Sequence, residues 1–456
     1  MYINNIKMNS EITIVDINPL PKMQLFVILI VLISEMSSLI YITPFLPFMI
    51  ESFGVEEKNI GYYSGSIISS YMVGQFFSNI IWGYISERIG IKPVIMFGLL
   101  SSSICTFIFG FSKNLTWVIT TRLVQGLLSG NLGVTKTYLY LITDKSNEAK
   151  AFSVFPVGMC IGSIIAPAIG GLLETPSKIW PSIGENDLLF IYPYLLPSII
   201  ISILPLIGFI IAGLYVKESY KNRTEEFTDI NITTSEHNAI IAKSLFTKNI
   251  VLTILLYLNI RFTMIGSDNL FPLLLATSKK NRGLGFSTNQ IGLIYVISAS
   301  ILMGYSIIVI PYLKNKLGTY KLFLIAQFLF PISIFSISLL SNMNNINNIS
   351  LLIISSIFFI IKASIGSISI ILINIMINNS VEKKYLGRIN GISQSFAALG
   401  SIIGPILSGI AYSWSLKNDN FFPLNIHFSF TLFAVISVLN IMATALLDNS
   451  INNRIN

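Results

Sequence analysis

Residues 162–173 read GSIIAPAIGGLL and residues 400–411 read GSIIGPILSGIA, so six of twelve positions match at an offset of 238 residues. A second pair of strings, NIGYYSG at 59–65 and QIGLIYV at 290–296, opens alike at the similar offset of 231 residues. Both offsets are close to half of the 456-residue chain. The repetition predicts two homologous halves, and such halves are typical of transporters because they can rock about a central site.

The composition indicates that the solvent of this chain is a lipid bilayer. Hydrophobic residues make up 53% of it and charged residues 11%, and the mean hydropathy is +0.73. A soluble chain of this length needs far more polar surface. Since a spanning helix needs about 20 apolar residues, the apolar runs predict twelve spans, at 24–50, 60–85, 93–111, 115–142, 151–173, 191–216, 250–275, 289–313, 321–340, 350–378, 389–414 and 427–447.

One long polar segment divides these spans into six and six. We therefore expect an all-α membrane protein with twelve transmembrane helices in two pseudo-symmetric six-helix bundles. The expected divisions are an N-terminal tail (1–23), a first bundle (24–216), a central loop (217–249), a second bundle (250–447) and a C-terminal tail (448–456).

The distribution of basic residues predicts the orientation. With the N-terminus in the cytoplasm, 18 Lys and Arg residues fall in cytoplasmic loops and tails, 7 fall outside and 4 fall within spans. Basic residues concentrate on the cytoplasmic side of membrane proteins, so both termini are expected there. The same loops explain the net charge of +8 without a nucleic-acid partner, and we expect a monomer whose partners are the lipid bilayer and a small-molecule solute.

Residues for other chemistry are scarce. Cys105 and Cys160 lie inside apolar runs, which indicates neither a disulfide framework nor a cysteine metal site. The two histidines, His237 and His427, form no cluster with metal-ligand spacing. The sequence has no phosphate-binding GxxxxGK[ST] loop and no G-x-S-x-G nucleophile motif. We expect no metal, no cofactor and no enzymatic activity, with a proton gradient as the energy source.

A cytoplasmic loop between the second and third spans reads GYISERIGIK at 83–92. It resembles the major facilitator signature G-x-x-x-D-R-x-G-R-K, although an isoleucine, Ile91, replaces one basic residue. The resemblance implies that the acid of this loop faces the positive end of a neighbouring helix and latches one state of the transporter. The alternative is an ordinary basic hairpin. The gating residues that this motif implies are Gly83, Glu87, Arg88, Gly90 and Lys92.

Two further motifs lie within spans. TRLVQGLLSG in the fourth span is similar to the family's R-x-x-Q-G motif at Arg122, Gln125 and Gly126, which implies proton or substrate coupling; the alternative is a structural arginine. GSIIAPAIGG in the fifth span resembles an antiporter motif and favours proton-coupled export; the alternative is packing alone. Small residues allow close helix packing, and the residues concerned in the two repeated strings are Gly162, Pro167, Gly170, Gly171, Gly400, Gly404, Pro405 and Gly409.

The closest resemblance is to the zinc-induced facilitator-like group, near the tetracycline-resistance-type drug:proton antiporters. The superfamily resemblance covers the whole chain, and the subfamily resemblance lies mostly in the first half. The group's His-Asp pair in the seventh span is not evident, and Asp268 is the nearest acid. The stretches that carry the resemblance are IGYYSG (60–65), WGYISERIGIKPVI (82–95), GGLLETPSKIWPS (170–182), IYPYLLPS (191–198), RINGIS (388–393) and AYSW (411–414).

Ionisable residues inside spans are costly and mark solute or proton pathways. Arg122 and Lys136 are fourteen residues apart, which predicts one shared face of a continuous helix. Four basic groups against two acidic ones favour an anionic or zwitterionic solute over a metal ion. The expected pathway residues are Glu35, Arg122, Gln125, Lys136, Arg261, Asp268 and Lys362.

Glu35 is the expected proton carrier, because a carboxyl group removed from water can exchange a proton in a useful range. Lys136 could instead extend to the cytoplasmic interface, and Asp268 to the outer one. The leading hypothesis is proton-coupled antiport of a small organic solute. A facilitative uniporter and a non-transporting sensor or scaffold on the same fold stay open, since fold does not fix function.

Overall fold

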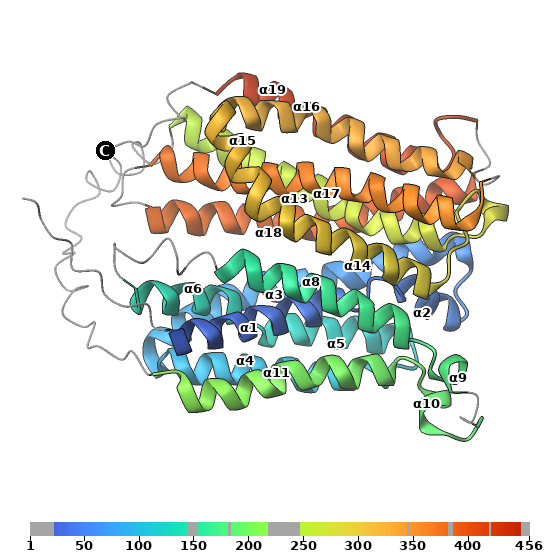
Figure 1. Ribbon diagram of the computed structural model, residues 1–456, viewed down its shortest axis with the longest axis horizontal. Helices are drawn as coiled ribbons and strands as arrows, with labels where there is room; N and C mark the ends of the chain where they lie inside the picture. Colours follow the sequence, from blue (N-terminus) through green and yellow to red (C-terminus); the bar gives the residue numbers. More distant parts are fainter. Residues whose placement is uncertain are drawn as a thin grey trace, which may run out of the picture.

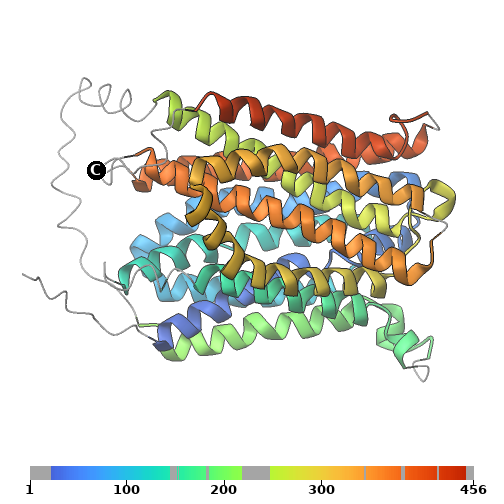
Figure 2. The same cartoon turned by 45° about the horizontal axis from the view of Figure 1, so that its top comes forward.

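The computed structural model describes residues 22–143, 151, 154–180, 184–217, 247–343, 346–381, 386–418 and 421–447. Every regular element among them is a helix, and the long helices run side by side along the long axis of the molecule (Figures 1 and 2). The predicted tails and most of the central loop lie outside the described residues. The predicted fold of twelve spans in two bundles is confirmed.

The first six spans follow the predicted runs closely. Their helices are α1 (Lys22–Ile40) with α2 (Leu46–Ser52), α3 (Ile60–Ile89), α4 (Ile91–Phe109), α5 (Leu115–Leu128) with α6 (Asn131–Leu141), α8 (Val154–Leu173) and α11 (Leu195–Tyr215). Three short helices lie in the connections: η1 (Glu57–Asn59), α9 (Pro176–Ile179) and α10 (Leu188–Ile191).

The second six spans form the other bundle, above the first in Figure 1. They are α13 (Lys248–Ala276), α14 (Thr288–Gly304) with η3 (Tyr305–Val309) and α15 (Ile310–Leu317), α16 (Thr319–Ser338) with η4 (Leu339–Met343), α17 (Asn348–Asn379), α18 (Leu386–Lys417) and α19 (His427–Ala445). A short turn, η2 (Lys279–Asn281), joins α13 to α14.

Eight of the described helices are long and apolar enough to cross a membrane: α1, α4, α11, α13, α16 (with η4), α17, α18 and α19. The remaining four spans are α3, α5–α6, α8 and α14–α15. We call the end of the molecule where α1 begins and α19 ends the terminal end, and the opposite end the far end. The terminal end is the predicted cytoplasmic side.

The two bundles meet through the repeated strings of the sequence. Helix α3 packs on α18, and α8 packs on α14. The string at 59–65 therefore lies against the string at 400–411, and the string at 162–173 lies against the string at 290–296. A Cβ atom added to Gly171 would lie 2.7 Å from the Cα atom of Gly292, and one added to Gly65 would lie 2.2 Å from the carbonyl oxygen of Pro405. Only glycine allows so close an approach of two helix backbones.

Hydrogen bonds also join the bundles toward the far end. The carboxylate of Glu57 accepts three of them, from the backbone N–H of Ser278 at 2.5 Å, from its hydroxyl at 3.0 Å and from the Asn281 amide at 2.5 Å. Nearer the middle, Ser64 donates to Asn269 at 2.7 Å. These contacts bring the bundles together at the far end.

The turn between α3 and α4 is shorter than the sequence predicts. Helix α3 continues through Ile89, so most of the predicted loop at 83–92 is helical. Gly90 alone makes the turn, with a φ of 97° that side chains rarely adopt, and α4 begins at Ile91. The correction follows from glycine itself, because one residue at positive φ can reverse the chain where a longer loop was expected.

The fourth span is broken, which corrects a second expectation. Ser129 has an extended backbone (φ −93°, ψ 97°) between α5 and α6. Side chains from α3 compensate for lost helical hydrogen bonds: Ser78 donates to the carbonyl of Ser129 at 2.7 Å, and Trp82 donates to that of Leu127 at 3.0 Å. Arg122 and Lys136 therefore do not share the face of one continuous helix.

Candidate functional site

Glu35 lies inside the first bundle with 3% of its surface exposed. Its Oε1 accepts a hydrogen bond from the Tyr71 hydroxyl at 2.9 Å and another from the hydroxyl of Ser129, at the break between α5 and α6. Its Oε2 has no hydrogen-bond partner among the described residues. The carboxyl group is thus held through one oxygen by two hydroxyl groups, and the side chain of Asn131 also lies close enough to interact with it.

Arg122 is also buried, with 1% of its surface exposed. Its Nη1 donates to the carbonyl of Ser38 at 2.9 Å and to Gln125 at 3.0 Å. The guanidinium carbon lies 4.7 Å from the ring centroid of Phe109 and 5.3 Å from that of Tyr41. Within the described part of the chain, Nε and Nη2 have no partner. Aromatic faces and one carbonyl therefore offset much of the cost of burying this charge.

Tyr71 connects the two buried charges. Its phenol interacts electrostatically with both Glu35 and Arg122, and Glu35 forms no ion pair among the described residues. Proton uptake by Glu35 would therefore leave no opposite charge unpaired. Sequence reasoning missed Tyr71 and Ser129, because a hydroxyl group in an apolar run gives no sign that it faces a carboxylate on another helix.

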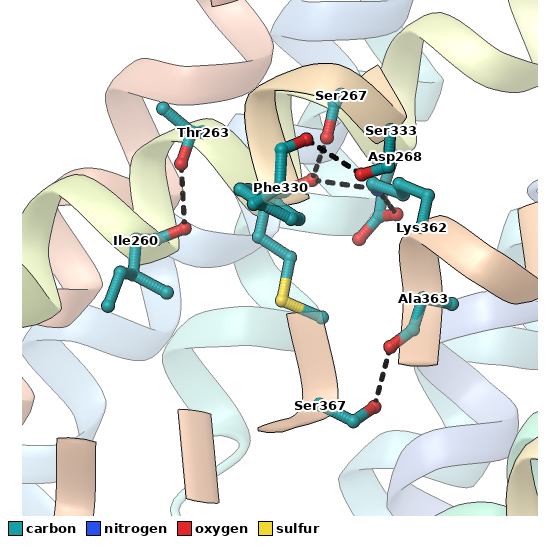
Figure 3. A network of polar contacts seen from close by, with 10 residues as sticks. Ile260, Thr263, Ser267, Asp268, Phe330, Ser333, Lys362, Ala363 and Ser367 are labelled. Atoms are coloured by element: carbon teal, nitrogen blue, oxygen red, sulfur yellow. Dashed lines mark hydrogen bonds and ion pairs between the residues drawn. The ribbon is translucent and has the colours of Figure 1, made fainter. Parts of the chain in front are cut away.

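The second bundle holds a buried ion pair between Asp268 of α13 and Lys362 of α17 (Figure 3). The side chain of Lys362 is 1% exposed and that of Asp268 is 36% exposed. The ammonium group also donates to the carbonyl of Met264 at 3.5 Å. The structure therefore places Asp268 in the interior, beside a lysine 94 residues away, rather than at the outer interface.

The two remaining basic residues lie on different bundles. Lys136 of α6 is exposed and lies 5.8 Å from the ring centroid of Phe155. Arg261 of α13 is half-buried and donates from Nε to the hydroxyl of Ser401 at 3.1 Å. Lys136 and Arg261 are close enough for their charges to interact. They come from different halves, so an anionic group between them would contact both bundles.

The predicted gating residues lie at the terminal end of α3 and the start of α4. Arg88 donates to the hydroxyl of Tyr84, and its guanidinium carbon lies 4.5 Å from that ring centroid. Lys92 is half-buried, and a Cβ atom on Gly83 would meet nothing within 4 Å. The side chain of Glu87 is outside the described residues, so its contact with a neighbouring helix stays a prediction.

The glycines of the antiporter-type motif lie at helix crossings. A Cβ atom on Gly162 would lie 2.8 Å from the carbonyl oxygen of Ile33 in α1, and one on Gly170 would lie 1.9 Å from that of Tyr41. In the second bundle, a Cβ atom on Gly400 or Gly404 would lie 2.3 or 2.5 Å from a carbonyl oxygen of α13, and one on Gly409 would lie 2.1 Å from that of Gly61. Pro167 and Pro405 lie inside α8 and α18.

Comparison with known proteins identifies the family. The family model described as the Major Facilitator Superfamily matches residues 26–361 and 260–454. The chain is 29% identical to the protein ZINC INDUCED FACILITATOR 1 of Arabidopsis thaliana, over 93% of this chain and 91% of the relative. It is 26% identical to the major facilitator superfamily multidrug transporter mfsB of Aspergillus fumigatus, over 88% and 80%.

A solved structure shares the fold. The crystal structure of a D-xylose-proton symporter aligns with a TM-score of 0.73 and 14% identity, over 95% of this chain and 99% of the other. This match agrees with the two-bundle fold described above. The chain belongs to the Major Facilitator Superfamily, as an integral multi-pass membrane protein of the transporter type.

Proposed function

We propose that this protein exchanges a small organic solute for protons by alternating access, with Glu35 as the proton carrier. The observation that carries the proposal is the environment of Glu35: a buried carboxyl group with two hydroxyl donors on one oxygen, no partner on the other and no ion pair among the described residues. Such a group can gain or lose a proton without leaving an opposite charge unpaired. Relatives named as multidrug transporters support export as the direction.

The charges of the interior support an anionic or zwitterionic solute. Asp268 and Lys362 compensate each other, and Arg122, Lys136 and Arg261 then outnumber Glu35. Solute binding near these cations and proton binding at Glu35 would each change the charge of the same region, which links the two events. The transporter works as a monomer in this proposal, since the bundles of one chain supply both sides of the site.

The orientation belongs to the same proposal. The excess of Lys and Arg at the terminal end indicates that this end, with both termini, faces the cytosol. This holds whether the protein lies in the plasma membrane or in the membrane of an organelle. The contacts of Glu57 and the paired glycines then close the side away from the cytoplasm. The state described here would accept solute from the cytoplasm.

The test uses purified protein in liposomes loaded with a pH-sensitive dye. Pools of organic anions, amino acids and drugs are added outside, and proton movement is recorded for the wild type and for Glu35→Gln. We expect at least one pool to drive proton movement in the wild type. Glu35→Gln should abolish this movement while labelled solute still exchanges for unlabelled solute, because the amide keeps the shape of the site without the proton.

A control replaces an exposed carboxyl group. Glu51→Gln, at the far end, should leave proton movement unchanged. Equal loss of proton movement and solute exchange in Glu35→Gln would remove Glu35 from the proposed role. Solute exchange without proton movement in the wild type would indicate a uniporter, and no flux of any solute would favour a sensor or scaffold.

A further inference from the structure

The carboxylate of Asp268 is held from one side only. Its Oδ1 pairs with the ammonium group of Lys362, which is fixed a second time by the carbonyl of Met264. The side chain of Asp268 nevertheless keeps 36% of its surface exposed. Figure 3 shows Lys362 reaching Asp268 from α17, with Ser267 and Ser333 nearby. The cation of this pair is therefore buried, whereas one side of the carboxylate is accessible.

That face lies on the side of α13 that also carries Arg261. Arg261 and Asp268 are seven residues apart on the uninterrupted helix α13, which puts them on one face and roughly 10 Å apart along the axis. Arg261 is close enough to Lys136 of the first bundle for their charges to interact. The neighbour of Asp268, Asn269, accepts a hydrogen bond from Ser64 of α3. The Arg261 end of this α13 face thus borders the other half of the transporter.

One aromatic residue, on α14, lies near this carboxylate. Tyr295 of α14 interacts electrostatically with Asp268. Its ring centroid lies 5.1 Å from that of Phe359 and 6.1 Å from that of Phe271, and the last two rings stack at 4.5 Å. A carboxylate beside an aromatic ring is a combination that binds ammonium groups, through charge and through the ring face.

We propose that Asp268 is the docking point for a protonated amine on the transported solute, and that Lys362 is the positioning residue that orients its carboxylate. The inference rests on the proposed function and adds the chemical class of the solute. When its amine pairs with Asp268, the rest of the solute would lie along the α13 face that ends at Arg261. A solute with an amine and an anionic group could therefore contact both ends of this face.

The competing explanation is that the pair only fastens α13 to α17. A single neutral substitution cannot separate the two, because removing one partner leaves a buried charge unpaired and damages folding. The double variant Asp268→Asn with Lys362→Met leaves no orphaned charge and keeps the volume of the buried side chain. Lys362→Arg retains the cation and should retain the function.

The experiment adds matched probes to the liposome assay. The probes are tyramine and tryptophan, each compared with its N-acetylated form, in which the single amine has lost its charge. We expect the wild type to move protons about tenfold faster with the amine than with the acetylated form in at least one pair, because the acetylated nitrogen cannot pair with a carboxylate. The double variant should lose this difference, and Asp187→Asn, an exposed loop control, should keep it.

The outcomes separate the inference from the proposed function. Proton movement with amine and acetylated probes at equal rates, or an unchanged preference in the double variant, would overturn the role of Asp268. Movement driven only by amine-free members of the pools would overturn it as well. Failure of every probe and pool to move protons or solute in the wild type is a different result, because it refutes the proposed function on which the inference depends.

Discussion

At the scale of single residues, the burial of Arg122 is the most demanding feature of the first bundle. The guanidinium group is planar and stacks on the rings of Phe109 and Tyr41, and it donates to Ser38 and Gln125. Lysine carries the same charge as a compact ammonium group that cannot reproduce this arrangement. The site therefore selects arginine by shape as much as by charge.

Arg122→Lys should lower solute exchange by about tenfold or more, since the loss of a stacked, hydrogen-bonded contact of this kind costs on the order of 1–3 kcal/mol. The variant should still insert and purify, because the positive charge remains. Exchange of labelled solute in liposomes measures the effect. Arg282→Lys, at an exposed loop position, is the matched control; equal exchange in both variants would contradict the prediction.

How far the sequence predicts the site differs from residue to residue. Glu35, Arg122 and Lys362 stand out because an ionisable residue inside an apolar span is costly and is seldom present without a function. Their partners do not stand out: the pairing of Lys362 with Asp268 depends on how α17 packs on α13, which no local pattern encodes. The predicted common face of Arg122 and Lys136 is wrong because the backbone at Ser129 interrupts the helix.

At the scale of elements, the crossing of α3 and α18 depends on glycine residues. Gly65 touches the backbone of Pro405, whereas Gly83, further along α3, has open space around it. The two glycines of one helix thus form a natural comparison between a position at the bundle contact and a position away from it.

Gly65→Val should push α3 away from α18 and open the far end, because overpacking a close contact costs roughly 1–3 kcal/mol. The reporter is a cysteine at Ser413, which is fully buried at this crossing, in a chain whose Cys105 and Cys160 are replaced by serine. Labelling of this cysteine by a membrane-impermeant maleimide should rise about tenfold. Ser66→Val, at an exposed position of the same helix, should leave labelling unchanged, and a rise of the same size there would show that the crossing is not responsible.

The sequence predicts elements better than their interruptions. Hydropathy finds all twelve spans because every span must be apolar along its length, whatever it packs against. The break at Ser129 and the extension of α3 to Ile89 escape it, since both depend on single backbone conformations. Ser78 and Trp82 supply the hydrogen bonds that make the break tolerable, and they lie about fifty residues earlier in the chain.

At the scale of the whole molecule, Glu57 is a polar link between the two bundles at the far end. Three hydrogen bonds reach one carboxylate from the connection between α13 and α14. Hydrogen bonds to a charged group contribute about 1.5–3 kcal/mol each. A link of this strength is enough to set the balance between the two states of an alternating-access transporter.

Glu57→Ala should shift that balance toward a state open at the far end, because the alanine variant has no acceptor for Ser278 and Asn281. Labelling at the Ser413 cysteine should increase by about tenfold or more in the resting protein. The neighbouring Glu56→Ala, at an exposed position, should behave like the wild type. Unchanged labelling in Glu57→Ala would mean that packing alone closes this end.

The overall architecture could be predicted from the sequence because the two halves of the chain carry similar strings. Two offsets near half the chain length predict two bundles, and the family match confirms them. The contact between the bundles could not be read, since it joins strings of different kinds: the copy at 162–173 meets the one at 290–296, and the copy at 400–411 meets the one at 59–65. Sequence similarity pairs each string with its counterpart in the other half, whereas in the structure each string contacts a string of the other kind.

This crossed pairing is the arrangement that two identical six-helix subunits related by a twofold axis would have. In such a dimer one helix crossing occurs twice, and a single change in a gene alters both copies together. Fusion of duplicated genes would have ended that constraint. Each half could then acquire what the other lacks, a lone acid at Glu35 on one side and an acid paired with a lysine on the other. The asymmetry of the interior is in this view a product of evolution after the fusion, built on a contact that is still symmetric.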